Sequence, residues 1–344
     1  LRIHCTGSRE MKLRMRQAIA AALADEMRAD DTVIVLGEDV AAAGGVFKAT
    51  EGLLEEFGPV RVRDTPISEM GFLGAAVGAA ATGLRPVVEI MFMEFLGVAL
   101  DQLVTQAAKY HYLSAGRLSV PLVLRGSVGA GLGFGAQHSQ TLEHWFSATP
   151  GLTVAVASTP ANAYGLLRSA IRDDNPVVLL EPRACYGDRG EVDRSEAGVV
   201  PLGVANRTAD GEDVTIIGLG RTAAVAQQAA EQAGGRWTAE VIDLQTLVPW
   251  DRRTVLESIG RTRRLVIVEE NPYGGGWGAD LAAEVSGRLF GELAAPVLRV
   301  TCPDVPVPFQ RDLERAWSPG PDVVRDQVDA LLATGRLPQP WWAA

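Results

Sequence analysis

The stretch DTPISEMGFLGAAVGAAATGLRPVVEIMF, residues 64–92, decides the fold class. It opens with a turn, continues into a glycine and alanine run at 71–83, and ends in the apolar segment 85–92. Ser68 is placed to cap the small-residue run as a helix. The segment 85–92 has the nearly continuous apolar pattern of a parallel strand that is covered on both faces. The stretch therefore predicts an α/β protein with a parallel sheet.

Glu69 places a carboxylate directly beside this glycine and alanine run. Gly74, Gly78 and the alanines leave room for another backbone or a flat ligand to approach closely. A carboxylate at such a seam is costly to bury without a partner. Two interpretations fit the residue at this point: an ordinary helix N-terminal carboxylate stabilised by the helix dipole, or a proton-handling glutamate in a dry pocket.

Strand and helix patterns alternate outward from this stretch along the whole chain. A strand is expected at 32–37 and a long helix at 95–113, and further strands follow up to residue 182. The pattern weakens in a polar, charged region and then resumes. We therefore expect an α/β fold with a first domain at 11–190, a linker at 191–212 and a second domain at 213–334.

Composition excludes several classes of protein. Of the 344 residues, 47% are hydrophobic and 22% are charged, which is enough apolar material for packed cores. The formal net charge of −10 argues against nucleic acid as a partner, because phosphate binding needs basic patches. No apolar run reaches the roughly 20 residues that span a bilayer, so we expect no membrane association. The first ten residues, LRIHCTGSRE, read as a leader ahead of Met11.

The cysteines and histidines show no metal or redox motif. Cys5, Cys185 and Cys302 are widely spaced, which is typical of a reducing compartment and predicts a cytoplasmic protein. The four histidines form no HExxH pair, so a zinc site is not expected.

A glycine-rich loop, SVGAGLGFGAQHSQ at 127–140, follows a predicted strand. Its spacing does not fit GxGxxG followed directly by a helix, which argues against a nicotinamide site. The loop presents His138 at the carboxyl end of a parallel strand, where α/β folds bind ligands. A surface or capping histidine is the alternative, and His144 in the following predicted helix is the competing residue.

No phosphate anchor is visible in the chain. It lacks GxxxxGK[ST], and it lacks a GDG followed 25–30 residues later by Asn, which would hold a magnesium diphosphate. The run YGGGWGAD at 273–280 could hold an anion on backbone N–H groups, but a tight turn is the favoured interpretation. The residues alone suggest a two-domain α/β protein with an acid/base pair, Glu69 and His138.

Taken together, several strings resemble one family closely over residues 12–334. They are GEDV (37–40), GGVFKATEGL (44–53), FGPVRVRDTPISEMGF (57–72), GLRPVVEIMF (83–92), DQLVTQAAK (101–109), GAQHSQ (135–140), SAIRDDNPVV (169–178), VIDLQTLVPWD (241–251) and the GGGWGAD turn. The chain resembles the beta subunit of the thiamin-diphosphate-dependent decarboxylating component of 2-oxoacid dehydrogenase complexes. This resemblance implies two three-layer α/β/α domains, a pyrimidine-binding domain and a transketolase C-terminal-type domain.

The resemblance also implies partners and cofactors. The beta subunit of this family works in an α₂β₂ heterotetramer, with thiamin diphosphate at the α/β interface. The alpha subunit supplies the magnesium and diphosphate motif, which would explain why this chain has none. A lipoyl domain or an acyl carrier protein would receive the acyl group, and the second domain could contact a transacylase core.

The resemblance assigns roles to individual residues. Glu69 matches the glutamate that hydrogen-bonds a ring nitrogen of the cofactor's aminopyrimidine, and Ile67, Met91 and Phe95 match residues beside that ring. Ordinary core packing is the alternative for these apolar side chains. His138 matches a histidine at the mouth of the active site that takes part in proton transfer as the acyl group passes to a lipoyl disulfide.

The resemblance further implies a potassium loop formed by Leu122, Ala170, Asp173 and Asn175, where carbonyl oxygens and one aspartate oxygen would hold the ion. Plain turn residues are the alternative for Asp173 and Asn175. The chain departs from the family pattern at Gln245, where arginine is common, and over residues 183–196.

The leading hypothesis is therefore a beta subunit that decarboxylates a 2-oxoacid, pyruvate being favoured, and transfers the acyl unit to a carrier thiol. Acetoin cleavage, branched-chain oxoacid decarboxylation and transketolase-like two-carbon transfer to an acyl carrier use the same apparatus. A catalytically silent assembly subunit is the alternative from another class, and the presence of both Glu69 and His138 argues against it.

Overall fold

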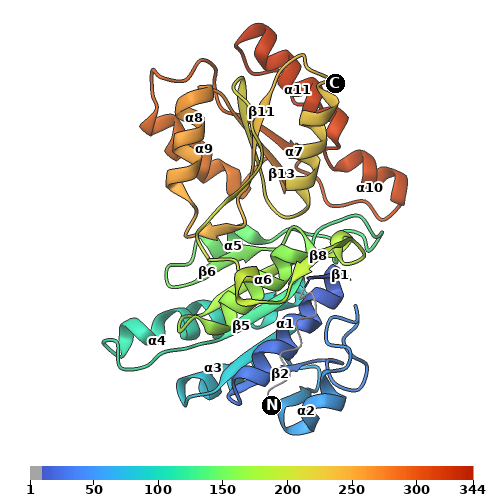
Figure 1. The fold of residues 1–344 in the computed structure, drawn as a ribbon, viewed down its shortest axis with the longest axis vertical. Helices are drawn as coiled ribbons and strands as arrows, with labels where there is room; N and C mark the ends of the chain where they lie inside the picture. The colour runs from blue at the N-terminus through green and yellow to red at the C-terminus, as the bar shows by residue number, and fades with distance from the viewer. Residues whose placement is uncertain (1–9, 344) are drawn as a thin grey trace, which may run out of the picture.

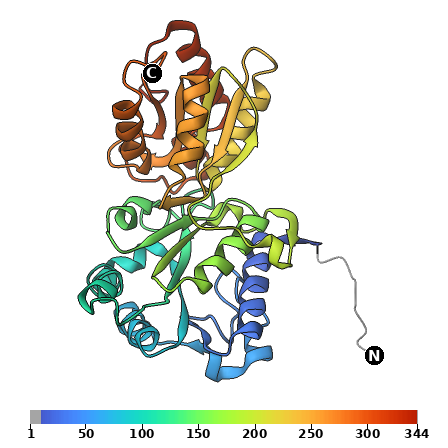
Figure 2. The same ribbon diagram turned by 60° about the vertical axis from the view of Figure 1, so that its left-hand side comes forward.

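The computed structural model describes residues 10–343, which form two stacked α/β units (Figures 1 and 2). Residues 1–9, which hold most of the predicted leader and Cys5, lie outside this range, whereas Glu10 begins strand β1 (Glu10–Arg14). Strand β1 pairs antiparallel with β8 (Arg189–Asp193) in a small two-stranded sheet.

The first unit is built on a seven-stranded sheet. In spatial order its strands are β12 (Thr246–Val248), β6 (Thr153–Val156), β7 (Val177–Pro182), β5 (Val123–Val128), β4 (Arg85–Phe92), β2 (Val33–Gly37) and β3 (Val62–Asp64). All neighbouring pairs are parallel except β12 with β6. The strand predicted at 85–92 is buried along most of its length, as its apolar pattern requires.

Helices cover both faces of this sheet. One face is covered by α1 (Met15–Ala29) and α6 (Pro160–Arg172). The other face carries α3 (Glu69–Ala81), two short helical segments, η1 (Met93–Val98) and η2 (Gln102–Ala107), and α5 (Glu143–Ser147). The remaining helical segments of this unit are α2 (Leu53–Arg61), α4 (Ala108–Leu113), η3 (Arg183–Cys185) and η4 (Glu196–Gly198).

The second unit has a five-stranded sheet. Its spatial order is β14 (Leu298–Cys302), β13 (Leu265–Pro272), β10 (Val214–Gly218), β11 (Ala239–Asp243) and β9 (Asn206–Ala209), and only β9 is antiparallel. One face packs against α7 (Arg221–Gln232) and α11 (Pro321–Thr334), and the other against α8 (Arg252–Thr262) and α9 (Trp277–Arg288). Helix α10 (Arg311–Trp317) precedes α11. Both units are thus three-layer α/β/α structures, as expected.

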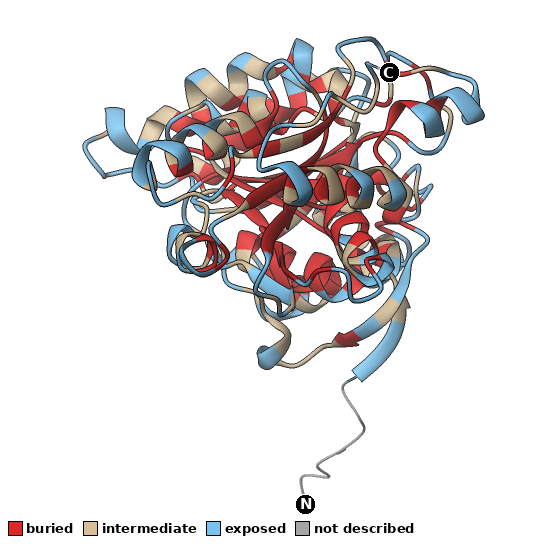
Figure 3. Ribbon diagram, turned by 90° about the horizontal axis from the view of Figure 1, so that it is seen from above, coloured by how far each residue is buried: buried red, intermediate tan, exposed pale blue. Residues whose placement is uncertain are grey.

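The apolar core is continuous from one unit to the other. The cluster beneath α3 and η1 continues to the strands that face α8 and α9. Figure 3 shows the buried residues concentrated along the strands and on the inner faces of the helices. The two units are therefore packed together rather than joined only by a flexible connection.

Two sequence expectations need correction. The long helix predicted at 95–113 is three consecutive segments of different type: the 3₁₀ segment η1, the π-type segment η2 and α4. Gly97 and Val98, both poor helix formers, lie at the end of the first. The predicted linker contains structure of its own, because β9 lies within it and joins the second sheet. The exact domain boundaries remain a prediction.

Strand β12 crosses from the second half of the chain to the edge of the first sheet. Gln245, just before it, has a positive φ of 59° and is buried, and its side chain bonds Asn162 and donates to Val204 O (2.9 Å). The departure from the family pattern at Gln245 therefore lies in a contact within this chain.

Asp243, at the end of β11, is buried at the same junction. Burial raises the pKa of Asp243 to about 7, although hydrogen bonds from Ser158 Oγ–H and Gln245 N–H lower it. A carboxyl group whose folded-state pKa is raised stabilises the fold at pH values below its unfolded pKa. That contribution is lost as the pH rises through the folded pKa.

We therefore expect Asp243→Asn to stabilise the protein increasingly between about pH 4 and pH 7, with a constant gain above that range. The gain should be on the order of 1 kcal/mol for each unit of pKa shift. Thermal melts of the variant and of the exposed control Asp210→Asn, recorded from pH 4 to pH 8, would measure it. A gain that does not change with pH would contradict this interpretation.

Candidate active site

The carboxyl ends of five neighbouring parallel strands form one edge of the first sheet. In spatial order they are β7, β5, β4, β2 and β3. The segments that follow them carry, in the same order, Arg183, His138, Phe95, Glu38 and Glu69. Ligands of open parallel sheets bind beyond these carboxyl ends. The structure thus brings both predicted proton-handling residues, Glu69 and His138, to one edge.

Glu69 is the first residue of α3 and is half-buried. Ser68 occupies the N-cap position as predicted, but its side chain makes no capping hydrogen bond. Gly74 packs closely against the Gln102 side chain, whose Oε1 atom would lie 2.8 Å from a Cβ at this position. Among residues 10–343, neither a hydrogen bond nor an ion pair engages the Glu69 carboxylate, so it is available to a ligand.

Glu38 is a second carboxylate at this edge. Burial raises its pKa, and the negative charge of Glu69 raises it further, as does that of Asp39. Its Oε1 atom is buried and has no hydrogen-bond partner within the described part of the chain. Two carboxylates that interact in a partly buried region favour retention of a proton by one of them.

An aromatic wall lies at the same edge of the sheet. It consists of Phe47, Phe92, Phe95, Phe134 and His138. The His138 ring centroid lies 5.1 Å from that of Phe92 and 5.3 Å from that of Phe95. Most of the ring pairs in the wall are edge-to-face, an arrangement that aromatic rings prefer. Two residues predicted from the sequence, Phe95 and His138, are therefore in direct ring contact.

The two other predicted apolar residues are placed differently. Met91 is half-buried near the end of β4, whereas the Ile67 side chain is 86% exposed. Met70, on the first turn of α3, is also exposed. Within this chain, Ile67 and Met70 are therefore solvent-exposed.

The second unit holds the glycine-rich loop that carries His138. Glu314 in α10 accepts hydrogen bonds from Gly131 N–H and Gly133 N–H, both at 2.9 Å. Glu270 accepts one from Ala130 N–H at 2.6 Å. Carboxylates that accept from backbone N–H groups form strong hydrogen bonds. The start of the loop is thus anchored by side chains more than 130 residues away in the sequence.

A pocket of about 720 Å³ opens between this loop and the second unit. His144, the competing histidine, lines it together with Trp145, Asn271 and Trp317. His144 Nδ1 lies 3.8 Å from Asp280 Oδ2. His144 therefore faces the junction of the two units, while His138 belongs to the aromatic wall.

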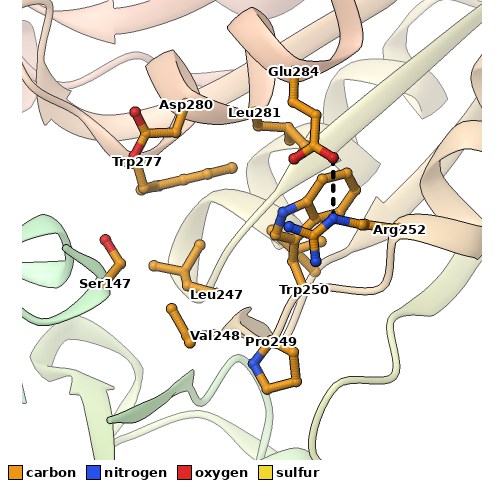
Figure 4. A pocket seen from close by; sticks show the side chains of 11 residues that line it. Ser147, Leu247, Val248, Pro249, Trp250, Arg252, Trp277, Asp280, Leu281 and Glu284 are labelled. Carbon is orange, nitrogen blue, oxygen red and sulfur yellow. Dashed lines mark hydrogen bonds and ion pairs between the residues drawn. The ribbon is translucent and has the colours of Figure 1, made fainter. Parts of the chain in front are cut away.

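A separate pocket of about 390 Å³ lies near α9 and the segment after β12 (Figure 4). The indole rings of Trp250 and Trp277 line it, and Arg252 pairs with Glu284 at 3.0 Å on one side. The predicted site residues do not line this pocket, so it is not the candidate active site.

The four residues of the predicted potassium loop lie at the opposite end of the parallel strands. Leu122 O accepts a hydrogen bond from Val177 N–H at 2.9 Å, and Ala170 O accepts one from Asp173 N–H at 3.3 Å. Asp173 Oδ1 accepts from Asn175 N–H at 2.8 Å. A carbonyl oxygen retains a second lone pair. Each of these oxygens already accepts at least one hydrogen bond from the protein, and the potassium loop stays a prediction.

Arg85 is bound to the same loop. Its Nη1 donates to Ile171 O at 3.0 Å and to Asp173 O at 2.9 Å, and its Nη2 pairs with Asp174. A cationic side chain therefore braces the loop in this structure.

Sequence reasoning missed Glu38, Arg183 and Glu314. Glu38 could have been found, because it directly follows a predicted strand, as His138 follows another, within the quoted string GEDV. Arg183 and Glu314 gave no such signal, because their roles depend on the neighbours that the fold brings to them.

Comparison with known proteins decides the family. Residues 11–188 match the family described as Transketolase, pyrimidine binding domain, and residues 203–324 match Transketolase, C-terminal domain. The pyruvate dehydrogenase E1 component subunit beta of Rhizobium meliloti is 44% identical over 329 residues, which cover 95% of this chain and 71% of the relative. This chain belongs to the family of 2-oxoacid dehydrogenase beta subunits.

Other beta subunits of the family act on different substrates. The 3-methyl-2-oxobutanoate dehydrogenase subunit beta of Mycobacterium tuberculosis is 44% identical over 322 residues, covering 93% of this chain and 92% of the relative. The acetoin:2,6-dichlorophenolindophenol oxidoreductase subunit beta of Bacillus subtilis is 41% identical over 336 residues, covering 94% and 98%.

A solved split-gene transketolase, described as an inactive beta4 tetramer, has the same fold. It aligns with a TM-score of 0.74 at 23% identity, covering 94% of this chain and 99% of the other. A beta subunit with transketolase-type domains implies thiamin diphosphate as cofactor and an alpha subunit as partner.

In this beta subunit, a carboxylate of the same chain accepts a hydrogen bond from the glycine turn before α9. Gly278 N–H donates to Glu269 Oε2 at 2.8 Å, which supports a structural turn rather than an anion site. Residues 10–343 hold no cluster of three or more His, Cys, Asp and Glu side chains suited to a metal ion. Within the same range, the helices are too short or too polar to cross a membrane.

Proposed function

We propose that this beta subunit belongs to an enzyme that decarboxylates pyruvate and transfers the acyl group to a lipoyl disulfide, which is reduced as the thioester forms. The observation that carries the proposal is Glu69. Its carboxylate is half-buried, lacks a protein partner among residues 10–343, and lies at the same sheet edge as the aromatic wall and the raised-pKa carboxyl of Glu38. A carboxylate held in this way is suited to share a proton with a ring nitrogen.

The donor set at this edge fits the aminopyrimidine of thiamin diphosphate. Glu69 would bond its ring nitrogen, and Ile67, Met91 and Phe95 would flank the ring. When bound, the cofactor supplies the nucleophilic carbon and the electron sink for loss of CO₂ from the oxoacid. Glu69 would hold a proton at the ring nitrogen, and such a bond is strong where the dielectric is low.

His138 would handle the proton of acyl transfer. The S–S bond of the carrier breaks, one sulfur forms a thioester with the acyl group, and the other leaves as a thiolate that accepts a proton. The electrons come from the bond between the carbonyl carbon and the lost CO₂. His138 would deliver this proton, and its packing against Phe92 and Phe95 supports the role.

An alpha subunit would complete the site in an α₂β₂ heterotetramer. Ile67 and Met70 beside Glu69 are exposed apolar side chains, which is typical of a surface that a partner covers. The alpha subunit would also hold the diphosphate through magnesium, because this sequence has no motif for it. A potassium ion in the loop of Leu122, Ala170, Asp173 and Asn175 would act as a structural brace.

The acyl acceptor would be a lipoyl domain or an acyl carrier protein, and a transacylase core would be a further partner. Cys185 and Cys302 are free and buried, which supports a reducing compartment and thus the cytoplasm.

The donor substrate is tested with this chain copurified with its alpha-type partner, thiamin diphosphate and magnesium. Pyruvate, 3-methyl-2-oxobutanoate, acetoin and a ketose phosphate would be compared with 2,6-dichlorophenolindophenol as electron acceptor. We expect the highest kcat/KM with pyruvate. A clear preference for another donor would reject pyruvate as the substrate, whereas inactivity with all four would favour a silent assembly subunit.

A further inference from the structure

Arg183 is a buried cation that the proposed chemistry has not used. It directly follows β7 and is only 2% exposed. Burial lowers the pKa of its guanidinium, and the nearby carboxylate of Glu94, 3.8 Å away, opposes this effect. An arginine remains charged even so. A buried charge of this kind must be satisfied by specific contacts.

The contacts of Arg183 converge on the loop that carries His138. Its Nη1 donates to the carbonyl oxygen of His138, and its Nε donates to Ser127 Oγ at 3.0 Å. Glu94, which faces the guanidinium, also accepts a hydrogen bond from Gln140 N–H at 2.7 Å. The backbone from His138 to Gln140 is thus held by one cation and its neighbouring carboxylate.

The same guanidinium packs against the aromatic wall. Its central carbon lies 4.5 Å from the ring centroid of Phe92, 5.3 Å from that of Phe134 and 5.8 Å from that of Phe47. Phe92 in turn contacts the His138 ring. Cation–π contacts become stronger when the cation is removed from water, as that of Arg183 is. Arg183 therefore acts on His138 by two routes, through the backbone and through the rings.

We propose that Arg183 is the positioning residue that sets the His138 ring for proton delivery during acyl transfer. This inference rests on the proposed role of His138. The start of the loop is anchored by Glu270 and Glu314. Arg183 holds the part of the loop that bears His138.

The test uses the complex with the alpha-type partner and measures two rates. The first is the rate of acyl transfer from pyruvate to free lipoamide. The second is the rate of pyruvate decarboxylation with 2,6-dichlorophenolindophenol as electron acceptor, and the measured ratio is the first rate divided by the second. We expect Arg183→Met to lower this ratio about tenfold to a hundredfold, because small misplacements of a reacting group have effects of that size. Arg183→Lys, which retains the charge without the planar fork, should restore part of the ratio.

A double-mutant cycle separates positioning from general loss of structure. In a His138→Ala background, Arg183→Met should lower the ratio little further, because the residue that it positions is absent. The matched control is Arg168→Met. Arg168 is 4% exposed and ion-paired with Glu26 and Glu196, so the control removes a buried arginine of the same unit away from the site. It should reduce the melting temperature without changing the ratio.

Three outcomes would overturn the proposal. An unchanged ratio in Arg183→Met, with a lowered ratio in His138→Ala, would reject Arg183 and leave the proposed function intact. Equal ratios for Arg183→Met and Arg168→Met would show a purely structural arginine. An unchanged ratio in His138→Ala would reject the role of His138, and the proposal for Arg183 with it.

Discussion

Glu69→Gln should reduce turnover of the assembled enzyme by about 10²–10⁴-fold, the range for loss of a general acid–base group. The amide has nearly the same shape as the carboxylate, but it cannot share a proton with a ring nitrogen in the same way. Turnover of pyruvate, with either lipoamide or the dye as acceptor, would measure the loss. Both rates should fall together, because Glu69 acts before the pathways to the two acceptors separate.

The variant should fold normally. Glu69 is half-buried and has no partner among residues 10–343, so the amide leaves no group of this chain unpaired. The substitution also removes the negative charge that raises the pKa of Glu38. Glu55→Gln on the exposed surface of α2 is the matched control and should be fully active. Full activity of Glu69→Gln would refute the mechanism, and unfolding of it would show a structural carboxylate.

His138→Ala should lower acyl transfer to lipoamide by about 10²–10⁴-fold, and decarboxylation with the dye much less. The difference arises because the dye takes electrons without the proton transfer that the leaving sulfur requires. The ratio of the two rates is the measurement. His138→Asn is a second variant that keeps a polar side chain against Phe92 and Phe95. It controls for a collapse of the aromatic wall in His138→Ala.

His144→Ala is the natural control for this prediction. His144 is the competing histidine of the same region, but the structure places it in α5 at the junction of the two units. Its replacement should leave the ratio unchanged. A loss of transfer in His144→Ala, with normal transfer in His138→Ala, would reverse the assignment.

The common location of Glu69 and His138 could be predicted because each follows a parallel strand, and such strands end at one edge. The order in which their neighbours lie along this edge could not be predicted. Glu38, Phe95 and Arg183 lie between and beside them only because the strand order is β7-β5-β4-β2-β3. That order depends on long-range pairing, which no local pattern of residues encodes.

Short or irregular elements escaped the sequence patterns for physical reasons. Strand β12 has only three residues, too few to show alternation, and its pairing with β6 is a contact between distant parts of the chain. Strand β9 consists of Asn206–Ala209, a polar edge strand that reads as linker. The anchoring of the glycine-rich loop by Glu314 likewise depends on packing of the second unit.

The most direct test of the central claim is calorimetric titration with thiamin diphosphate in the presence of magnesium. This chain alone would be compared with the chain copurified with its alpha-type partner. The shared-site account predicts binding only to the complex, because Glu69 and the aromatic wall hold one end of the cofactor and the partner holds the diphosphate. Tight binding to the chain alone, or no binding to either sample, would contradict it.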